Sequence, residues 1–354
     1  MELQPYDSVL AETRDGNKVL AIVFGYEHPK DGIRAVPKYI PYNLAGLTFL
    51  GHTWKMLDEE WSRITYTPLV GRETKAYEIL KKHYQEFLRE IKGREEFVVP
   101  LDAIKDVFYS KEGAKKILRE PYEEMNKVRK SAYKLLKSLE KEVGIDNLGV
   151  TGSLLFSGEI DDFSDIDITL YGSDTYHRVT NLLDNLRELP VHFRTKEEWI
   201  KYYEEGHYGF KVYSPFDKTI FAKHMVHKRD QFIFDGIEVT LFAVRNEKER
   251  KQLNEYKSVI SEKNIGFITL KGRVLNNEES MFMFPSIYSF EVNGGRRVTI
   301  ENYVRACISQ AQCGDVIEVG GLLKKVVNNN RQIEERILVT PENRGYVINL
   351  DWMI

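Results

Sequence analysis

The stretch Gly149-Val-Thr-Gly-Ser-Leu-Leu-Phe-Ser-Gly-Glu-Ile-Asp-Asp-Phe-Ser-Asp-Ile-Asp-Ile-Thr-Leu170 organises the chain. It carries a Gly-Ser pair, Gly152-Ser153, and after eleven further residues Asp165-Ile166-Asp167 inside a short apolar run. Side chains alternate along a strand, so we expect the two aspartates on one face and Ile166 and Ile168 in the core. Carboxylates on Cα atoms roughly 6–7 Å apart can share two divalent ions about 3.5–4 Å apart, the arrangement that serves in-line phosphoryl transfer.

Length and composition indicate an ordinary globular protein of two or three domains. The chain has 354 residues, of which 42% are hydrophobic and 30% charged, and its net charge is −3. A nucleic-acid contact would therefore need a local basic face. The cysteines are Cys307 and Cys313, without Cys-x-x-Cys or His-x-Glu-x-x-His spacing, so we expect neither a disulfide framework nor zinc.

The beginning of the chain, Met1-Glu-Leu-Gln-Pro-Tyr6, lacks a charged segment followed by an apolar one. No apolar run approaches the ~18 residues that span a bilayer. We therefore expect a cytoplasmic protein with no membrane partner.

The first two segments that we predict are a β-rich N-terminal module, residues 1–71, and a helical segment, residues 72–143. Asp15-Gly16 between apolar runs predicts a hairpin. Apolar residues spaced by three or four between Tyr77 and Ile91 predict a helix. A second helix is expected from about Pro121 to Glu142, with the proline in its first turn.

Basic residues are in excess in the second half of this helical segment. From Lys105 to Glu142 there are eleven Lys or Arg and seven Asp or Glu, a difference of four. A solvated helical face and a surface for a phosphate backbone both fit this excess.

The third segment, residues 144–260, contains the opening stretch. A strand, Asn147–Thr151, is expected to lead into the Gly-Ser turn, where a short helix from Leu154 leaves backbone amides free for phosphate. The acidic strand covers Asp165–Tyr171, and Ser173 is expected to cap a helix that continues to Leu189.

A second acidic strand follows in the same segment. Asp235-Gly236 predicts a hairpin turn, after which Glu238 faces away from Ile237 and Val239. Residues 190–232 interleave aromatic and basic side chains, a composition typical both of a base-stacking surface and of an amphipathic helix beside a cleft. A charged helix, Glu247–Ser258, is expected to link this segment to the next one.

The fourth segment, residues 261–354, is expected to be a small β-barrel or sandwich. Its strands include Ile265–Leu275, Val316–Val319, Leu322–Val327 and Tyr346–Leu350, separated by glycine and asparagine turns.

Gly-Ser, a spacer and Asp-x-Asp between apolar residues resemble the motif of the nucleotidyltransferase superfamily typified by DNA polymerase β and the CCA-adding enzymes. Thr151 stands at a usually apolar position of that motif, whereas Gly152-Ser153 and Asp165-Ile166-Asp167 match it. A third carboxylate is expected on a later strand, where this chain has Glu238 in place of the more frequent aspartate. The resemblance covers roughly residues 148–244, and the whole chain looks like uncharacterised archaeal predicted nucleotidyltransferases.

The resemblance implies catalytic and metal-binding roles for Asp165, Asp167 and Glu238. The carboxylates would hold two Mg²⁺ ions, with Mn²⁺ as the alternative ion. Gly152, Ser153 and Ser164 would bind the nucleotide, with backbone amides beside Ser153 at the β- and γ-phosphates of an NTP such as ATP. Glu238 would serve the metal that activates the attacking hydroxyl, as or near the general base.

These observations together predict an α+β fold: a nucleotidyltransferase core with a mixed sheet and helices, flanked by small β-rich modules. The leading hypothesis is a Mg²⁺-dependent enzyme that moves an NMP from an NTP to a hydroxyl on a nucleic-acid end, most simply RNA. Transfer to a small molecule or a protein side chain, and a non-catalytic nucleic-acid-binding protein on the same fold, are the alternatives. The acceptor, the base added, the use of a template and the oligomeric state stay open.

Overall fold

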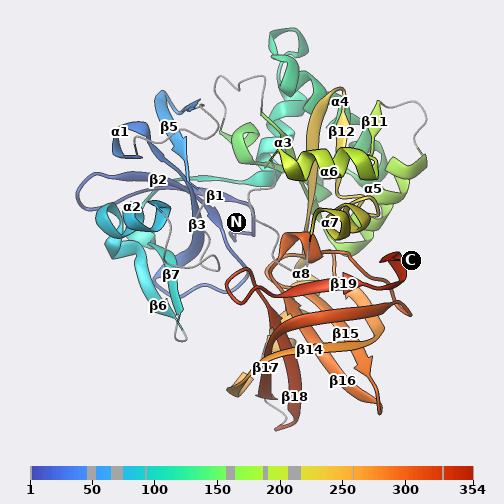
Figure 1. Ribbon diagram of the computed structural model, residues 1–354. Helices are drawn as coiled ribbons and strands as arrows, with labels where there is room; N and C mark the ends of the chain where they lie inside the picture. Colours follow the sequence, from blue (N-terminus) through green and yellow to red (C-terminus); the bar gives the residue numbers. More distant parts are fainter. Residues whose placement is uncertain are drawn as a thin grey trace. The chain divides into compact units, whose positions relative to one another are not determined.

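A computed structural model of the chain shows a mixed α+β fold with helices and three sheets (Figure 1). It describes residues 2–45, 53–64, 75–91, 94–156, 164–185, 190–205, 217–257, 259–328 and 331–353. The contacts divide the chain into two compact units. Unit 1 comprises Met1–Leu170, Arg187–Pro190 and Phe234–Phe242, and unit 2 comprises Tyr171–Leu186, Val191–Ile233 and Ala243–Ile354. The division into four segments stays a prediction.

The first sheet of unit 1 has the strand order β4-β5-β3-β2-β1-β8, and β7 pairs with β3 and β6. Ser8 lies opposite Ile22 and Glu12 opposite Lys18, so the predicted Asp-Gly hairpin is confirmed. The sheet residues Val9, Val19 and Val99 are fully buried in one core. The strands of this sheet are β1 (Ser8–Glu12), β2 (Lys18–Val23), β3 (Gly32–Pro41), β4 (Trp54–Met56), β5 (Glu59–Arg63), β6 (Leu88–Ile91), β7 (Arg94–Pro100) and β8 (Ile104–Phe108).

The segment predicted to be helical up to Ile91 is helical only in part. A short helix, α1 (Tyr42–Ala45), precedes it, and α2 covers Lys75–His83. The chain then turns through Gln85–Phe87 into β6, and β7 and β8 follow. Phe87 packs edge-on against Phe97 of β7 with ring centroids 5.5 Å apart, and both rings are fully buried. This aromatic packing in the sheet core overrides the helical spacing of the sequence.

The long helix α4 begins later than predicted, at Lys127, and ends at Val143. Asn126 is its N-cap, because the Asn126 side chain accepts a hydrogen bond of 2.9 Å from the backbone N–H of Arg129. Pro121 instead precedes a single 3₁₀ turn, Tyr122–Glu124. Helix α3 (Ser110–Arg119) comes before this turn. A side-chain cap therefore decides the start of α4, and the proline only ends the preceding helix.

A five-stranded sheet has the order β11-β12-β13-β10-β9. β9 and β10 are antiparallel, with Thr151 opposite Asp167 and Leu148 opposite Leu170. Ser173 and the following residues form the predicted helix α5, which the structure describes to Asn185. The strands of this sheet are β9 (Leu148–Thr151), β10 (Ile166–Tyr171), β11 (Val191–His192), β12 (Gln231–Phe234) and β13 (Ile237–Val244).

In unit 2 the chain from residue 259 onward forms a closed barrel (Figure 1). The pairing β14-β15-β16-β18-β17 returns to β14, and β19 adds to β17. Every pair is antiparallel except β16–β18, which is parallel. The barrel strands are β14 (Val259–Glu279), β15 (Ser286–Val292), β16 (Arg296–Asn302), β17 (Val316–Asn328), β18 (Ile333–Val339) and β19 (Tyr346–Asn349).

The two strands predicted at 316–319 and 322–327 are one strand, β17. Gly320 and Gly321 do not break it. A Cβ on Gly320 would lie 2.3 Å from Cε1 of Tyr346, so this glycine leaves space for a ring on the paired strand.

Helices α6 (Lys196–Glu204) and α7 (Lys218–Met225) share one hydrophobic core with the barrel. Trp199 is 1% exposed and Phe221 is fully buried in this core, so these rings pack in the interior rather than stacking on bases. Lys211 and Tyr213 of the same aromatic and basic segment lie outside the described residues.

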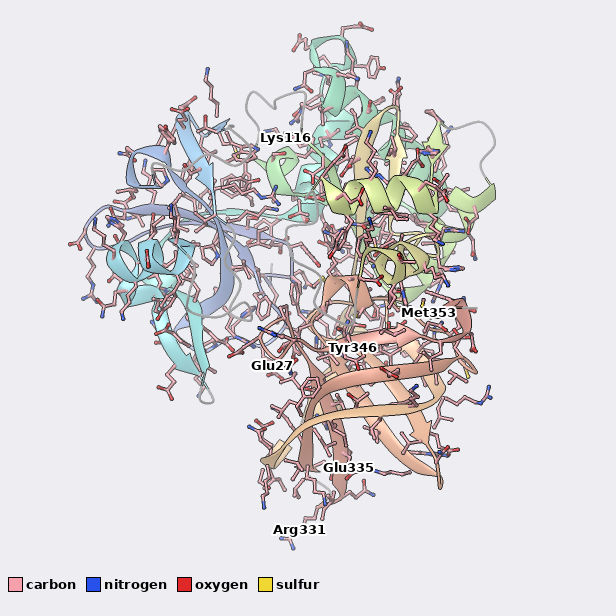
Figure 2. All side chains as sticks on the ribbon, in the orientation of Figure 1. Glu27, Lys116, Arg331, Glu335, Tyr346 and Met353 are labelled. Atoms are coloured by element: carbon pink, nitrogen blue, oxygen red, sulfur yellow. The ribbon has the colours of Figure 1, made fainter. Side chains whose placement is uncertain are left out.

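Helix α8 covers Glu247–Lys257. Figure 2 places Tyr346 and Met353 toward one end of the barrel, with Arg331 and Glu335 toward the other. None of the helices in the described part of the chain has the length and apolarity needed to cross a membrane.

Candidate functional site

The Gly-Ser turn and the acidic strand meet where β9 pairs with β10. Thr151, the last residue of β9, lies opposite Asp167. The next residue, Gly152, has φ +68° and starts a 3₁₀ turn, Gly152–Leu155. A Cβ on Gly152 would lie 2.7 Å from Oδ2 of Asp167. Both the backbone conformation and the space therefore require glycine at this position.

The two serines predicted to bind the nucleotide lie at the ends of this site. Ser153 follows Gly152 in the turn and is 7% exposed, and Ser164 precedes β10 and is 6% exposed. The Ser164 hydroxyl is buried without a hydrogen-bond partner among the described residues. A buried hydroxyl without a partner costs free energy, so a ligand oxygen or a water at Ser164 would stabilise the site.

The two aspartates differ in exposure. Asp165 is exposed, whereas Asp167 is 6% exposed. The Asp167 carboxylate lies where a Cβ on Gly152 would point. Ile166 and Ile168 are fully buried, as the predicted alternation requires. One carboxylate thus faces solvent and the other is held against the Gly-Ser turn.

Glu238 lies on β13, the neighbour of β10 in the sheet. It is exposed, while Ile237 and Val239 on either side are buried. The preceding turn is fixed, because Asp235 accepts hydrogen bonds of 3.0 Å from both Ser131 and Lys134 of α4. Asp235 and Gly236 have φ values of 54° and 78°, which is the geometry of a two-residue hairpin turn, so the predicted turn is confirmed. The topology brings Glu238 to the strand beside the aspartates.

The donor set suits a hard divalent cation. Mg²⁺ is held by one or two carboxylates together with phosphate oxygens of a substrate, and Asp165 and Asp167 supply two carboxylates beside a glycine turn. Among the described residues no three or more His, Cys, Asp or Glu are grouped so that they could hold a metal ion by themselves. Asp165 and Asp167 would therefore hold the ion together with the phosphates of the nucleotide.

The N-terminal sheet supplies a wall of this site that sequence reasoning missed. Tyr39 of β3 is 3% exposed and packs edge-on against Phe156, which follows the Gly-Ser turn, with ring centroids 6.2 Å apart. Burial raises the pKa of the Tyr39 hydroxyl above its usual range; nearby Arg63 opposes this rise, and the negative charges of Asp165 and Asp167 add to it. The only signal in the sequence was the aromatic content of β3 to β5, which does not reveal its partner.

A buried carboxylate connects the N-terminal strand to the same region. Asp7 is 2% exposed and accepts hydrogen bonds of 2.8 Å from the backbone N–H groups of Gln4 and Ser110. Ser110, the first residue of α3, donates a 2.6 Å hydrogen bond to the carbonyl of Val150 in β9. Burial raises the pKa of the Asp7 carboxyl to about 6, although both N–H donors lower it. Asp7 is thus linked to β9 by hydrogen bonds through Ser110 at the start of α3.

Several of the basic side chains between Lys105 and Glu142 make ion pairs within unit 1. Arg129 makes an ion pair with Glu120 at 2.5 Å, Lys134 with Asp235 at 3.0 Å, and Lys137 with Glu140 at 2.8 Å. Lys115 contacts Asp146 at 3.0 Å. These pairs favour the solvated helical face over a phosphate-binding surface.

No family model matches this chain. The chain is 25% identical over 334 residues to an uncharacterized protein of the archaeon Methanocaldococcus jannaschii, and the match covers 89% of each chain.

Proposed function

We propose that the chain is a Mg²⁺-dependent nucleotidyltransferase of the DNA polymerase β-like superfamily, acting in the cytoplasm on an RNA end. The observation that carries the proposal is the approach of Gly152 to Asp167, since a Cβ there would lie 2.7 Å from the carboxylate. A phosphate chain held at the turn by backbone amides would thereby be close to the carboxylates that bind its metal.

The reaction transfers the α-phosphoryl group with its nucleoside. The acceptor hydroxyl oxygen forms a bond to the α-phosphorus, the bond between the α-phosphorus and the bridging oxygen of pyrophosphate breaks, and pyrophosphate leaves with that electron pair. Glu238 takes the hydroxyl proton, directly or through a water molecule. Metal ions held by Asp165 and Asp167 would supply neutralisation of the charge that develops in the reaction.

Each remaining residue has a role in positioning. Ser153 and the amides of the turn orient the β- and γ-phosphates, and the Ser164 hydroxyl donates to a phosphate oxygen or to a water molecule. Asp165 and Asp167 hold the ions. Tyr39 of the N-terminal sheet packs against Phe156 and so keeps the turn in place.

The test is transfer of label from each α-³²P-labelled NTP, with Mg²⁺, to total RNA. Wild-type protein is compared with Asp165→Ala/Asp167→Ala and with the control Asp15→Ala/Asp102→Ala, which removes two exposed aspartates of the same unit. Labelled RNA that depends on Asp165 and Asp167 but not on the control pair supports the proposal. Label on a small molecule or on protein would identify the acceptor as the alternative class. RNA binding without any transfer would leave a non-catalytic binding protein.

A further inference from the structure

The barrel of unit 2 has the strand order of a nucleic-acid-binding fold. Its strands, numbered along the chain from β14 to β18, pair as first-second-third-fifth-fourth and close on the first, with the third and fifth parallel. This is the five-stranded Greek-key barrel of the OB-fold, which binds oligonucleotides or oligosaccharides across its second and third strands and adjoining loops. Fold alone does not give function, so the side chains at that place decide.

Two lysines lie directly opposite each other on paired strands of this barrel. Lys263 of β14 is the register partner of Lys325 of β17, so both side chains leave the same face. Both are exposed, and among the described residues neither makes an ion pair. Like charges directly opposite destabilise a sheet, with Cβ atoms about 4.5–5.5 Å apart. An anionic ligand would remove this repulsion.

Three of the carboxylates nearby are paired with basic side chains. Glu335 lies opposite Lys325 on the other side, but its carboxylate is held by Arg296. Arg336 pairs with both Glu334 at 2.8 Å and Glu301 at 3.0 Å, so this group keeps one negative charge. The lysine pair therefore keeps its positive charge available to a ligand.

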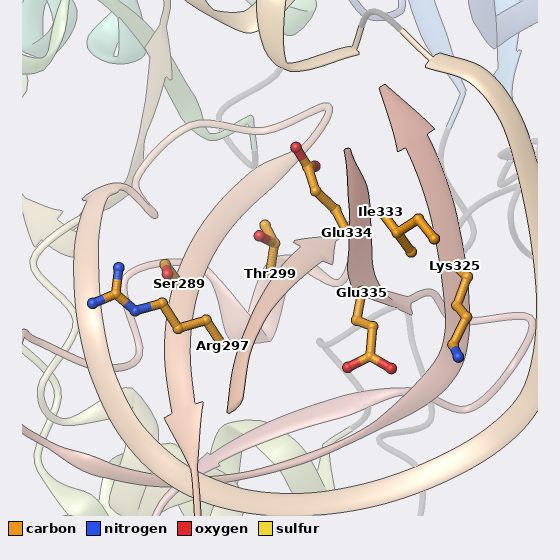
Figure 3. A pocket seen from close by; sticks show the side chains of 7 residues that line it. All are labelled: Ser289, Arg297, Thr299, Lys325, Ile333, Glu334 and Glu335. Carbon is orange, nitrogen blue, oxygen red and sulfur yellow. The ribbon is translucent and has the colours of Figure 1, made fainter. Parts of the chain in front are cut away.

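A cavity of about 490 Å³ opens at the same end of the barrel (Figure 3). Its lining includes Lys325, Glu335 and the exposed Arg297, with the hydroxyls of Ser289 and Thr299. Ile333, which is 72% exposed, adds an apolar surface. These residues come from the second and third strands of the barrel and from the β17–β18 hairpin, where OB-folds bind their ligands.

Arg297 is not fully isolated from negative charge. Its register partner is Glu291 of β15, which is partly exposed, but the described residues include no ion pair between them. The three cations Lys263, Lys325 and Arg297 thus stand against one negative charge on Glu291 and one left over beside Arg336. The positive side chains outnumber the negative charges at this end of the barrel, which favours binding of an anionic ligand.

We propose that this basic barrel end, comprising Lys263, Arg297, Lys325 and Ile333, binds single-stranded RNA. The cations contact successive phosphates, and one nucleotide enters the cavity against Ile333, which is the combination of charge and apolar contact that single-strand sites use. The identification of this RNA as the acceptor strand rests on the proposed function. The binding surface itself belongs to the barrel.

The test is fluorescence anisotropy of a 5′-labelled twelve-nucleotide oligo(U) RNA with the full chain. No NTP is added and EDTA is present, so that the candidate catalytic site contributes no metal-dependent binding. The affinities of wild type, Lys263→Ala/Lys325→Ala and Arg297→Ala are measured from 50 to 200 mM NaCl. Lys30→Ala/Lys248→Ala is the control, because both lysines are exposed and make no ion pair among the described residues. Thermal melts confirm that each variant is folded.

The double variant should bind about tenfold more weakly at 100 mM salt, and the slope of log K against log salt should fall in magnitude by about 1.4, the value for two phosphate contacts on a single strand. Arg297→Ala should reduce that slope by about 0.7. The control pair should bind like wild type. Equal affinity and slope in wild type and the double variant would overturn the inference. Failure of the wild type to bind the oligo(U) RNA would also overturn it.

Two further measurements separate this inference from the proposed function. Asp165→Asn/Asp167→Asn should bind the oligonucleotide like wild type, and its loss of label transfer would test the catalytic site alone. Failure of transfer, with binding that still depends on Lys263 and Lys325, would reject the enzyme and keep the RNA site. Size-exclusion chromatography with light scattering tests whether a second copy of the chain covers this surface instead. A dimer that dissociates in the double variant, with RNA affinity unchanged, would assign the surface to a second copy and reject the inference.

Discussion

Gly152 and Asp167 are in contact across the β9–β10 pair, where a methyl group on the glycine would lie 2.7 Å from the carboxylate oxygen. The candidate phosphate-binding turn and the candidate metal-binding strand are therefore built as one unit. A change at either residue should affect the other, which makes the contact itself testable.

Substituting Gly152→Ala should abolish nucleotidyl transfer and destabilise the protein. The φ of +68° costs an alanine about 1–2 kcal/mol, and the added methyl group displaces Asp167. Gly144→Ala is a matched control, because Gly144 has φ +79° and nothing within 4 Å of its Cβ position. Thermal melts should show a loss of stability in both variants, because a positive φ strains alanine, whereas transfer should be lost only in Gly152→Ala. Equal activity in the two variants would show that the contact has no catalytic importance.

The Asp7 carboxyl should make unit 1 more stable in mild acid. Its pKa is about 6 in the folded chain because of burial, against 3.8 in the unfolded chain, so the folded state holds the proton more tightly between these values. This contribution is fully present below pH 4 and is lost as pH rises through 6, and its full size is about 3 kcal/mol. Urea unfolding at pH 4.5 and 7.5 measures it, as the difference between wild type and Asp7→Asn. A pH dependence that is the same in both proteins would contradict the assignment.

His224 should make unit 2 less stable in mild acid, which is the opposite of the effect of Asp7 on unit 1. Its Nδ1 bonds the carbonyl of Ile220 at 2.8 Å, and its Nε2 accepts from the N–H of Asn349 at 2.9 Å, which requires a neutral ring. Burial lowers its pKa to about 4. Stability should therefore be lost as pH falls from 6.5 toward 4, by up to about 3 kcal/mol.

Melting temperatures at pH 7.5 and 5.0 test this in His224→Gln, with His192→Gln as control. His192 is exposed and bonds only Glu198 among the described residues. The loss on acidification should be smaller in His224→Gln than in wild type, and unchanged in the control. If His192→Gln reduced the loss of melting temperature on acidification as much as His224→Gln does, burial of His224 would not be its cause.

Phe156→Ala should destabilise unit 1 by about 3–5 kcal/mol, the usual cost of removing a buried ring. Phe156 is 1% exposed and packs edge-on against Tyr39 and against Phe108, whose ring centroid is 5.2 Å away. Phe267→Ala is the control, since Phe267 is 55% exposed and should cost less than about 0.5 kcal/mol. Denaturant unfolding measures both. A small loss at Phe156 would mean that the N-terminal sheet does not support the Gly-Ser turn.

Local patterns in the sequence predicted the parts of the fold that local chemistry controls. The turns at Asp15-Gly16 and Asp235-Gly236 are present, and the alternation around Asp167 places the isoleucines in the core. Those features depend on backbone conformation and burial within a few residues, which a single sequence shows directly.

Features that depend on distant partners could not be predicted. Phe87 belongs to a sheet core because Phe97 packs against it, and Gly320 continues a strand because the ring of Tyr346 fills the space beside it. The wall that Tyr39 contributes to the candidate site is another case, since more than a hundred residues separate Tyr39 from Asp165. In each case a tertiary contact decides between structures that are equally compatible with the local sequence pattern.

The most direct test of the account is release of pyrophosphate coupled to label transfer by wild type and by Asp165→Asn/Asp167→Asn, with Mg²⁺, RNA and each α-³²P-labelled NTP. Asparagine preserves the size of both side chains and removes the charges that would hold the ions. Wild type should give equal amounts of pyrophosphate and labelled RNA, and the variant should give neither product above background, with unchanged thermal stability. Transfer at the same rate in both proteins would contradict the proposed function.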